Sequence, residues 1–478
     1  QFMSYIVIDQ GTSSTKAFLF SDRGRILHQK RIKHKLKRPK PFHIECNPKT
    51  ILDEIVYLFN EMLTKDRSEN IHGLGFAFQR STFLFWEKSS CSPLTPAISW
   101  QDSRATVILD KFKKYEKKVW KITGAPLSAH FGGPKFYYMF HNNRNLKQKV
   151  KNGDVYFGPL SAFIVHSITG QPAIDESIAG RTLMYDIHKG VWSKFTLDLF
   201  GVPIDCLPPI KPVKHKYGNV LNSKIPLLAV IGDQQSALIG QSGLKKNTIG
   251  SNFGTSASIQ YNVGSEPIVS PGLISSILFS NQKSKFFILE GTINACNSLF
   301  HHLEKVLNIP HEKMQWDIRA KGINTEGIYI PGFSGISTPY WKPGFPDIFI
   351  DTGKNPNQII RAGMESIGFL FNDILKCFSE SGIELPKSIN ASGGAARPVL
   401  LQFISSLTNL EICYSDLKDR TAIGVFKILN NEELNDANEL NNKKRRFKPK
   451  YLVNRVEKEE KWHKTLIDSN LKNSYSEI

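Results

Sequence analysis

The chain has 478 residues, more than the roughly 250 to 300 at which a single hydrophobic core stops growing, so we expect two domains. Hydrophobic residues make up 40% and charged residues 22%, and no apolar run approaches the roughly 20 residues of a membrane helix, which favours a soluble enzyme over a membrane protein. The six cysteines stand singly, without metal-type or redox spacing, so a reducing cytoplasm is the expected location.

The formal net charge is +19, and two basic runs, 23–40 and 443–450, suggest nucleic-acid binding at first sight. The basic residues are not interleaved with stacking aromatics, however, and lysine is abundant along the whole chain. We therefore interpret the charge as solvated surface that can also attract anionic substrates, and we expect neither nucleic acid nor a membrane as a partner.

Two turns of the same composition head the two halves of the chain. The strand-like residues 5–8 lead through 11–13, Gly-Thr-Ser, into 17–20, and a second Gly-Thr-Ser, 254–256, closes into 257–261. Glycine lets the backbone approach an anion, successive N–H groups form a concave nest, and the hydroxyls add donors. One such turn is ordinary hairpin chemistry. Two of them predict a nucleotide held between duplicated domains.

Between these turns, apolar spacing predicts a helix over 48–63 and strands over 74–78, 83–86 and 227–231. Polar groups follow two of the strands, and strand ends are where ligands usually bind in open α/β sheets. One group is 79–82, Gln-Arg-Ser-Thr, and the other contains Asp233. From its position alone, Asp233 is either a helix N-cap or a catalytic carboxylate.

Taken in order, these pieces resemble the FGGY family of carbohydrate kinases, and within it glycerol kinases most. The resemblance runs from about residue 5 to 466 and is carried by 9–13, 79–80, 85–88, 97–104, 232–235, 333–335, 339–341 and 393–395. It implies an α/β protein of two duplicated ribonuclease H-like domains, as in actin and sugar kinases, with the active site in a central cleft. We expect residues 3–243 to hold the acceptor site, the first phosphate loop and the catalytic aspartate, and residues 244–478 to hold the second phosphate loop and the adenosine site.

The resemblance also implies cofactors and residue roles. ATP and Mg²⁺ are the expected cofactors, with Asp233 as general base and with Asp9, through water, and Asp233 as the magnesium site. The expected acceptor-binding residues are Gln79, Arg80, Ser81, Trp100, His130, Asp233, Gln234 and Ser258. The expected nucleotide-binding residues are Thr12, Ser13, Lys16, Gly254, Thr255, Asn297, His301, Gly393, Gly394, Ala395 and Pro398.

Several of these positions depart from glycerol kinases. Ser81, His130 and Ser258 stand where those enzymes have glutamate, tyrosine and phenylalanine, which predicts a roomier and more hydrophilic pocket for a longer polyol or a sugar. On the nucleotide side, Asn297, His301 and Pro398 replace glycine, glutamine and asparagine, and Lys16 replaces arginine. These changes weaken the case for ordinary ATP affinity, and they leave a different base or phosphoryl donor open.

The sequence therefore predicts an ATP-dependent kinase that phosphorylates a hydroxyl of a small polyol or ketose. Two alternatives stay open: a glycerol kinase proper, and a catalytically weak relative that senses a metabolite or binds a partner. Relatives of this kind often form dimers or tetramers, so a homodimer or homotetramer is expected by resemblance.

The sequence supports three smaller predictions. His301 and His302 are adjacent, which on a helix sets them about 100° apart, and with no partner carboxylate at ligand spacing a metal site is not expected there. Cys296 is interpreted as helix packing. Residues 430–478 are polar and are expected to form surface helices over the second domain.

Overall fold

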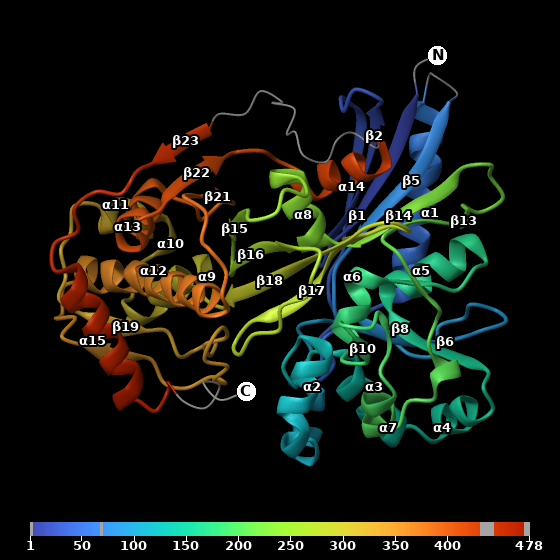
Figure 1. Cartoon of the computed structure of the whole chain (residues 1–478), viewed down its shortest axis with the longest axis horizontal. Coiled ribbons are helices and arrows are strands. Elements are labelled where there is room, and N and C mark those ends of the chain that lie inside the picture. The colour runs from blue at the N-terminus through green and yellow to red at the C-terminus, as the bar shows by residue number, and fades with distance from the viewer. Residues whose placement is uncertain (1–2, 67–69, 431–443, 473–478) are drawn as a thin grey trace.

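Two large mixed β-sheets form the centres of the two halves of the chain in the computed structural model, which describes residues 3–66, 70–430 and 444–472 (Figure 1). The first sheet has the order β13 (Lys214–Asn219), β14 (Pro226–Gly232), β5 (Ile71–Phe78), β1 (Ser4–Gln10), β2 (Ser14–Ser21), β3 (Ile26–Lys33). The second has the order β17 (Ile274–Ser280), β18 (Lys285–Ile293), β16 (Ala257–Gly264), β15 (Ile249–Phe253), β21 (Ser388–Ser392), β22 (Glu411–Ser415), β23 (Lys444–Phe447).

The two sheets share one internal pattern. In the first, β3, β2 and β1 are antiparallel neighbours, and β5 and β14 then run parallel to β1. In the second, β18, β16 and β15 are antiparallel neighbours, and β21 and β22 run parallel to β15. The same order and directions in both halves confirm the predicted α/β architecture of two duplicated ribonuclease H-like domains. Whether the boundary falls at 243/244 stays a prediction.

Shorter strands complete the sheets. A four-stranded sheet joins β4 (Glu45–Cys46), β7 (Ala97–Ile98), β6 (Phe83–Glu87) and β8 (Val155–Pro159). Three two-stranded sheets pair β9 (Ile174–Asp175) with β12 (Ile210–Lys211), β10 (Tyr185–Asp186) with β11 (Val191–Trp192), and β19 (Ile328–Ile330) with β20 (Ile348–Ile350). The predicted strand 83–86 thus exists as β6, but it belongs to another sheet than β5, so residues 79–82 connect two sheets.

The helices surround these sheets. In the first half they are α1 (Pro48–Lys65), α2 (Glu116–Thr123), α3 (Gly132–Asn142), α4 (Arg144–Lys151), α5 (Leu160–Thr169), α6 (Glu176–Ala179), α7 (Lys194–Phe200) and α8 (Asp233–Ser242). In the second they are α9 (Asn297–Val306), α10 (His311–Met314), α11 (Trp316–Ala320), α12 (Pro356–Glu380), α13 (Pro398–Thr408), α14 (Arg420–Asn430) and α15 (Arg455–Asp468). Short 3₁₀ turns lie at Arg104–Lys111, Lys113–Tyr115, Gly180–Thr182 and Ile204–Cys206.

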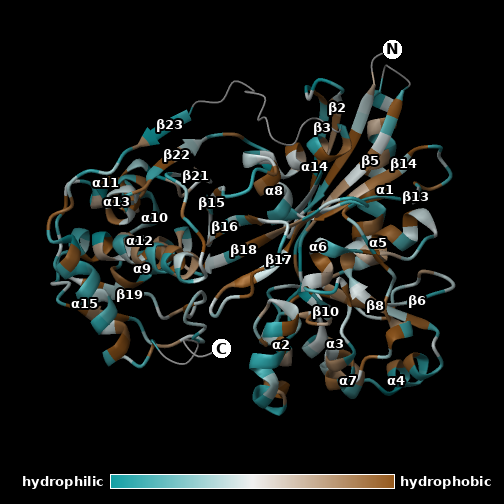
Figure 2. Cartoon of the chain, viewed as in Figure 1, coloured by the Kyte–Doolittle hydropathy of each residue, from teal (hydrophilic) through white to brown (hydrophobic). Residues whose placement is uncertain are grey.

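The first sheet is covered on both faces, because its side chains alternate between them. Ile8 and Leu19 belong to the core that also contains Leu58 of α1, while Val7 and Phe18 belong to the core that contains residues of α14. Figure 1 shows α14, which comes late in the chain, beside these first strands. Figure 2 shows the hydrophobic residues gathered along the central strands. No helix among the described residues is long and apolar enough to span a membrane.

The C-terminal part differs from its prediction. Residues 444–447 form the edge strand β23, paired antiparallel with β22, and only α15 is a helix among the described residues after 443. Backbone pairing with β22 explains the strand, since its side chains are largely exposed and give no apolar period. Residues 431–443 and 473–478 of that prediction, with Lys443 of the second basic run, lie outside the described residues.

Candidate active site

The first predicted phosphate loop is a tight hairpin between β1 and β2. The Gly11 amide donates to Ser14 O at 2.9 Å, and the register places Asp9 opposite Lys16. The indole N–H of Trp100 donates to Thr12 Oγ1 at 2.9 Å, while Ser13 is exposed. Gln79 Nε2 donates to Gln10 Oε1 at 3.0 Å and lies 3.3 Å from Gly11 O, so the residue after β5 supports the loop from behind.

The second predicted phosphate loop repeats this hairpin between β15 and β16. The Gly254 amide donates to Ser256 O at 2.9 Å, and Thr255 is exposed. The loop is seated on the start of α9, because Asn297 N donates to Gly254 O at 3.0 Å. Two sequence-predicted nucleotide residues are therefore direct neighbours.

The turn after β21 lies against the same loop. The Ala395 amide donates to Phe253 O at 2.9 Å. Gly393 has φ of +104°, and a Cβ there would lie 2.2 Å from Phe253 O, so only glycine fits this approach. Gly394 and Pro398 are exposed, and Pro398 begins α13, where its missing N–H costs no hydrogen bond. The structure thus brings together Gly254, Thr255, Asn297 and the turn 393–395.

Asp233 is the first residue of α8. Gly232 takes the N-cap position, so Asp233 is not the N-cap, which was one of the two sequence alternatives. Its Oδ1 accepts from the Gln234 amide at 2.7 Å and lies 3.7 Å from Arg80 Nε, with the side chain 25% exposed. Burial raises the pKa of Asp233, and the charge of Arg80 opposes that rise. A carboxylate that is reachable, ionisable and of raised pKa suits a general base.

Arg80 is fixed by a buried ion cluster. Its guanidinium forms a bidentate pair with Glu290 of β18 at 2.9 and 3.0 Å, and Arg181 binds the same carboxylate at 3.0 Å. Burial raises the pKa of Glu290, but the charges of Arg80 and Arg181 outweigh that effect and bring the pKa to about 2. Glu290 therefore stays ionised and holds Arg80 beside Asp233.

The remaining expected acceptor-binding residues lie in two groups, one around Trp100 and one beside Asp233. His130 Nδ1 lies 2.8 Å from Trp100 O, and Trp100 N donates to Thr82 Oγ1 at 3.2 Å. Trp100 is 41% exposed. Separately, Ser258 of β16 donates to Gln234 Oε1 at 3.3 Å, next to Asp233.

Ser81 joins the Trp100 segment through a buried lysine. Lys135 Nζ donates to Ser81 O at 2.8 Å and to Ser99 O at 2.7 Å. Ser81 itself has φ of +61°, a strained value for a residue other than glycine, and the lysine contact helps to hold it. These contacts place Ser81 and His130 around Trp100, and Ser258 next to Gln234, the neighbour of Asp233.

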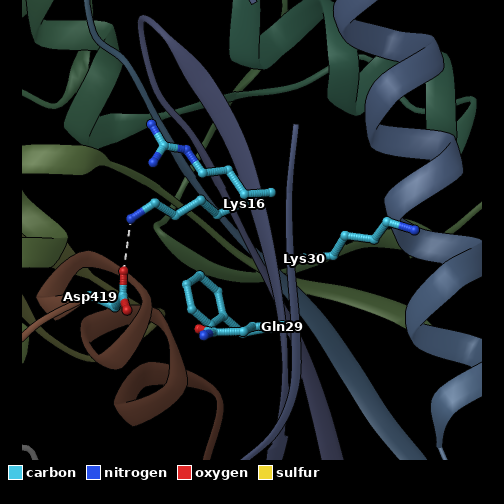
Figure 3. Close-up of a pocket in the computed structure, with 6 residues that line it drawn as sticks. Lys16, Gln29, Lys30 and Asp419 are labelled. Atoms are coloured by element: carbon cyan, nitrogen blue, oxygen red, sulfur yellow. Dashed lines mark hydrogen bonds and ion pairs between the residues drawn. The ribbon is translucent and has the colours of Figure 1, made fainter. Parts of the chain in front are cut away.

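Lys16 is paired with a carboxylate of the second half. Its Nζ lies 2.8 Å from Asp419 Oδ1, just before α14. Figure 3 shows the two side chains pointing toward one another, while Lys30 points away on the other face of the strands. Both line a cavity of about 290 Å³ with Phe18, Gln29, Lys30 and Arg31. None of the expected acceptor-binding residues lines this cavity.

Carboxylates gather next to the first hairpin. Burial, the charge of Asp233 and, more weakly, that of Asp419 raise the pKa of Asp9 to about 7, although Lys16 opposes the rise. A buried carboxylate whose pKa is raised by the charge of a second carboxylate suits a divalent cation, because oxygen ligands are those Mg²⁺ prefers.

Sequence reasoning missed several residues of this site. Glu290, Arg181 and Lys135 carry no role in any local motif, and their partners lie far away in the chain. The same holds for Arg420, whose guanidinium reaches Asn252 Oδ1 at 2.8 Å and also contacts Ser392 Oγ, joining the strands that precede the second loop and the 393–395 turn. Of these residues, only Lys135 is marked in the sequence, because it is a single lysine between apolar residues. The pattern alone assigns it no role.

Comparisons with known proteins agree with this geometry. The model of the N-terminal domain of the FGGY family of carbohydrate kinases matches residues 4–240, and that of the C-terminal domain matches 251–429. Glycerol kinase of Halothermothrix orenii is 32% identical over 437 residues, covering 88% of this chain and 87% of that protein. Glycerol kinase 1 of Thermotoga maritima is 29% identical over 439 residues, covering 88% and 89%.

Solved structures show the same architecture. The crystal structure of Plasmodium falciparum glycerol kinase with ADP superposes with a TM-score of 0.88 at 26% identity, covering 99% of each chain. Xylulose kinase of Lactobacillus acidophilus has a TM-score of 0.84 at 18% identity over 99% of each chain, which shows the fold alone.

The two duplicated domains, each with a glycine hairpin at the same place in its sheet, and these matches together identify a phosphotransferase of the sugar kinase class, with an alcohol group as acceptor. The chain belongs to the FGGY family of carbohydrate kinases. It phosphorylates a small sugar or polyol, with ATP as the phosphate donor.

Proposed function

We propose that the chain transfers the γ-phosphoryl group of ATP to a hydroxyl of a polyol or ketose longer than glycerol, with Asp233 as general base. Asp233 takes the proton of the acceptor hydroxyl, the oxygen forms a bond to the γ-phosphorus, the bond from that phosphorus to its bridging oxygen breaks, and ADP leaves. The observation that carries the proposal is Asp233 at the start of α8, 3.7 Å from Arg80 and next to the Gln234–Ser258 contact.

Asp9 and Asp233 would bind Mg²⁺, which stabilises negative charge on the phosphates when bound. The two hairpins would direct backbone amides and the hydroxyls of Thr12 and Thr255 at the phosphates. Asn297 and the 393–395 turn would lie along the nucleoside, because both contact the second hairpin.

Small or different polar side chains at the acceptor side support a substrate longer than glycerol. Ser81, His130 and Ser258 stand where glycerol kinases have larger or charged side chains, and we expect this difference to give the acceptor more room and other hydrogen-bonding groups. A hydroxyl-rich acceptor can pair with these groups, whereas a mismatched one leaves buried polar groups unpaired.

Glycerol kinase proper is the second candidate, because the two curated relatives named above are glycerol kinases at 32% and 29% identity. A cytoplasmic location, which the six unpaired cysteines accord with, and assembly into a homodimer or homotetramer also stay predictions.

The test is Mg-ATP turnover, followed by ADP release, on glycerol, tetritols, pentitols, ketopentoses, ketohexoses and gluconate. We expect one pentitol or ketose to exceed glycerol in kcat/KM, and Asp233→Asn to lower kcat at saturating Mg-ATP by about 10² to 10⁴. Because Asp233 is also a proposed ligand of Mg²⁺, the affinity for Mg-ATP is measured separately. The matched control is Asp198→Asn, because Asp198 is an exposed aspartate paired with Lys194.

Each contrary result has its own meaning. Highest kcat/KM on glycerol would replace the proposal with a glycerol kinase. No turnover on any acceptor, together with no ATP binding, would favour the catalytically weak relative. Full activity of Asp233→Asn would remove Asp233 as the base.

A further inference from the structure

Two histidines and a glutamate meet on the outer side of α9. His301 and Glu304 are three residues apart on this helix, and His311 begins α10. Glu304 Oε1 lies 3.4 Å from His301 Nδ1 and 2.7 Å from His311 Nδ1. Each residue offers one ligand atom, and the three atoms lie within 4.8 Å of one another. The prediction that no carboxylate stands at ligand spacing from His301 is therefore wrong.

The sequence missed this group because its third member arrives through a turn. Glu304 stands at i+3 from His301, but His311 is brought back only where the chain bends after α9, with Ile309 N donating to Glu304 O at 2.8 Å. His302, the other half of the histidine pair, points elsewhere: it lies 2.6 Å from Asp347 Oδ2 and stacks on Phe333.

The geometry suits a small tetrahedral ion. Zinc binds imidazole nitrogen and carboxylate oxygen at about 2.0 to 2.2 Å, which sets ligand atoms about 3.3 Å apart in a tetrahedron. The distance from Glu304 Oε1 to His301 Nδ1 already has this value, and the shorter distance to His311 has to open by less than 1 Å. His301 and His311 are 49% and 74% exposed, so water can supply the fourth ligand.

The surroundings hold the ligands in place. Glu304 is only 15% exposed, which restrains its carboxylate. Asn297 Nδ2 lies 3.2 Å from His301 Nε2. A metal on Nδ1 leaves a proton on Nε2, so the Asn297 amide has to turn its oxygen to this nitrogen in order to accept that proton in a hydrogen bond. The rings of His301 and His311 stack with centroids 5.3 Å apart. Both rings turn their Nδ1 atoms to the Glu304 carboxylate.

We propose that His301, Glu304 and His311 form a binding site for a transition-metal ion of the zinc class, separate from the magnesium site at Asp9 and Asp233. The donor set separates the two ions, because imidazole favours zinc, cobalt and nickel, whereas Mg²⁺ takes oxygen ligands and keeps its waters. The metal would fasten α10 to α9, one helical turn from Asn297.

The experiment uses the full chain without any affinity tag, titrated with Co²⁺ as the spectroscopic probe and then with Zn²⁺ in competition. We expect one Co²⁺ per chain, a visible absorption of low-coordinate Co²⁺, and its loss when Zn²⁺ is added. A large excess of Mg²⁺ should leave the signal unchanged. His311→Ala and Glu304→Gln should each weaken Co²⁺ binding at least about tenfold.

His141→Ala is the matched control, because His141 is an exposed helical histidine whose Nδ1 lies 2.8 Å from a backbone oxygen of its own helix, Tyr137 O. This variant should bind Co²⁺ like the wild type. Since His311 is on the surface, its alanine variant tests the site even where Glu304→Gln fails to fold. Unchanged affinity in His311→Ala, no Co²⁺ absorption in the wild type, or displacement by Mg²⁺ would overturn the proposal and leave only an ion-paired cluster.

Discussion

Lys135 is fully buried, which is unusual for a lysine because its charged form is costly to remove from water. Its Nζ donates to Ser81 O and Ser99 O, so it joins two segments of the acceptor side without facing a carboxylate directly. Burial lowers the pKa of Lys135 to about 7, and the charge of Asp102 only partly opposes this. The native chain therefore releases this proton long before the unfolded chain does.

The sign of the resulting pH dependence follows from linkage. Between pH 7 and about 10 the unfolded chain holds one more proton than the native chain at this residue, so stability rises with pH, by at most about 1.4 kcal/mol per unit. We expect the free energy of unfolding of the wild type to increase relative to that of Lys135→Met between pH 7 and 9. Urea unfolding of both proteins at three pH values measures this difference. Lys194→Met, at a lysine that is 90% exposed, should show no such trend. Parallel pH profiles of wild type and Lys135→Met would contradict the prediction.

Glu290 presents the opposite case, a buried carboxylate between two arginines. Glu290→Gln would remove the carboxylate that Arg80 and Arg181 share and leave only Asp233, 3.7 Å from Arg80, as a nearby counter-charge. Breaking one partner of a buried ion pair costs about 3 to 5 kcal/mol. We expect a clear fall in the thermal midpoint and a raised KM for the acceptor, because Arg80 would lose its fixed position beside Asp233.

The control for this change is Glu87→Gln. Glu87 pairs with Lys149 near the surface, where solvent screening leaves an ion pair little effect on stability. Equal effects of the two glutamine variants on the thermal midpoint would show that the buried cluster has no special weight. Neither Glu290 nor Arg181 could be assigned from sequence, because Glu290 lies 210 residues from Arg80.

At the scale of elements, α8 and α14 cross at closer range than side chains permit. A Cβ on Gly424 would lie 1.9 Å from Ser236 O, and one on Gly240 would lie 2.0 Å from Arg420 O. The helices touch backbone to backbone, and Ser236 Oγ donates to Thr421 O at 2.7 Å. Because α8 begins with Asp233, its seat on α14 also positions the proposed base.

Gly424→Ala should force these helices apart. Overpacking a close contact costs about 1 to 3 kcal/mol, and here the obstacle is backbone, which cannot turn aside. We expect a lower thermal midpoint and a lower kcat, since α8 carries Asp233. Gly180→Ala is the control, because a Cβ there meets nothing within 4 Å. If both variants melt together and turn over alike, the crossing does not position α8.

Elements with an apolar period could be predicted from sequence, and those formed by pairing alone could not. The helix expected over 48–63 is α1, Pro48–Lys65, because its apolar residues repeat at helical spacing and Asn47 caps its start. The first basic run was interpreted only as charge, yet it contains the strand β3, Ile26–Lys33. Its side chains are largely exposed, and pairing with β2 rather than burial fixes it.

The candidate site was predictable to a similar extent. Sequence motifs predicted the two hairpins and the position of Asp233. Glu290, Lys135 and Arg420 became visible only through contacts between segments that are distant in the chain.

At the scale of the molecule, three of the side-chain contacts that join the two halves of the chain involve residues of the proposed reaction site. Arg80 binds Glu290, Gln234 accepts from Ser258, and Lys16 binds Asp419. The Arg80–Glu290 pair is largely buried, with 13% and 2% of the two side chains exposed, whereas Lys16 and Asp419 are 33% and 23% exposed. Such a half-exposed pair contributes about 1 kcal/mol or less, so its lysine can change partner at little cost.

The last prediction follows from that exchange. Lys16 follows the proposed first phosphate loop along β2, and a nucleotide phosphate offers more negative charge than the Asp419 carboxylate. We expect Lys16→Met to raise the KM for Mg-ATP several-fold, and Asp419→Asn to leave it unchanged or lower it, because the asparagine frees the lysine and removes a negative charge.

Lys30→Met is the control, since Lys30 lines the same cavity but points to the other face of the strands (Figure 3). Steady-state kinetics at two salt concentrations separates the outcomes: the Lys16 effect should shrink with added salt, because screening weakens the attraction it removes. If Asp419→Asn instead raises KM as much as Lys16→Met does, then the ion pair itself, and not the freed lysine, is what nucleotide binding requires.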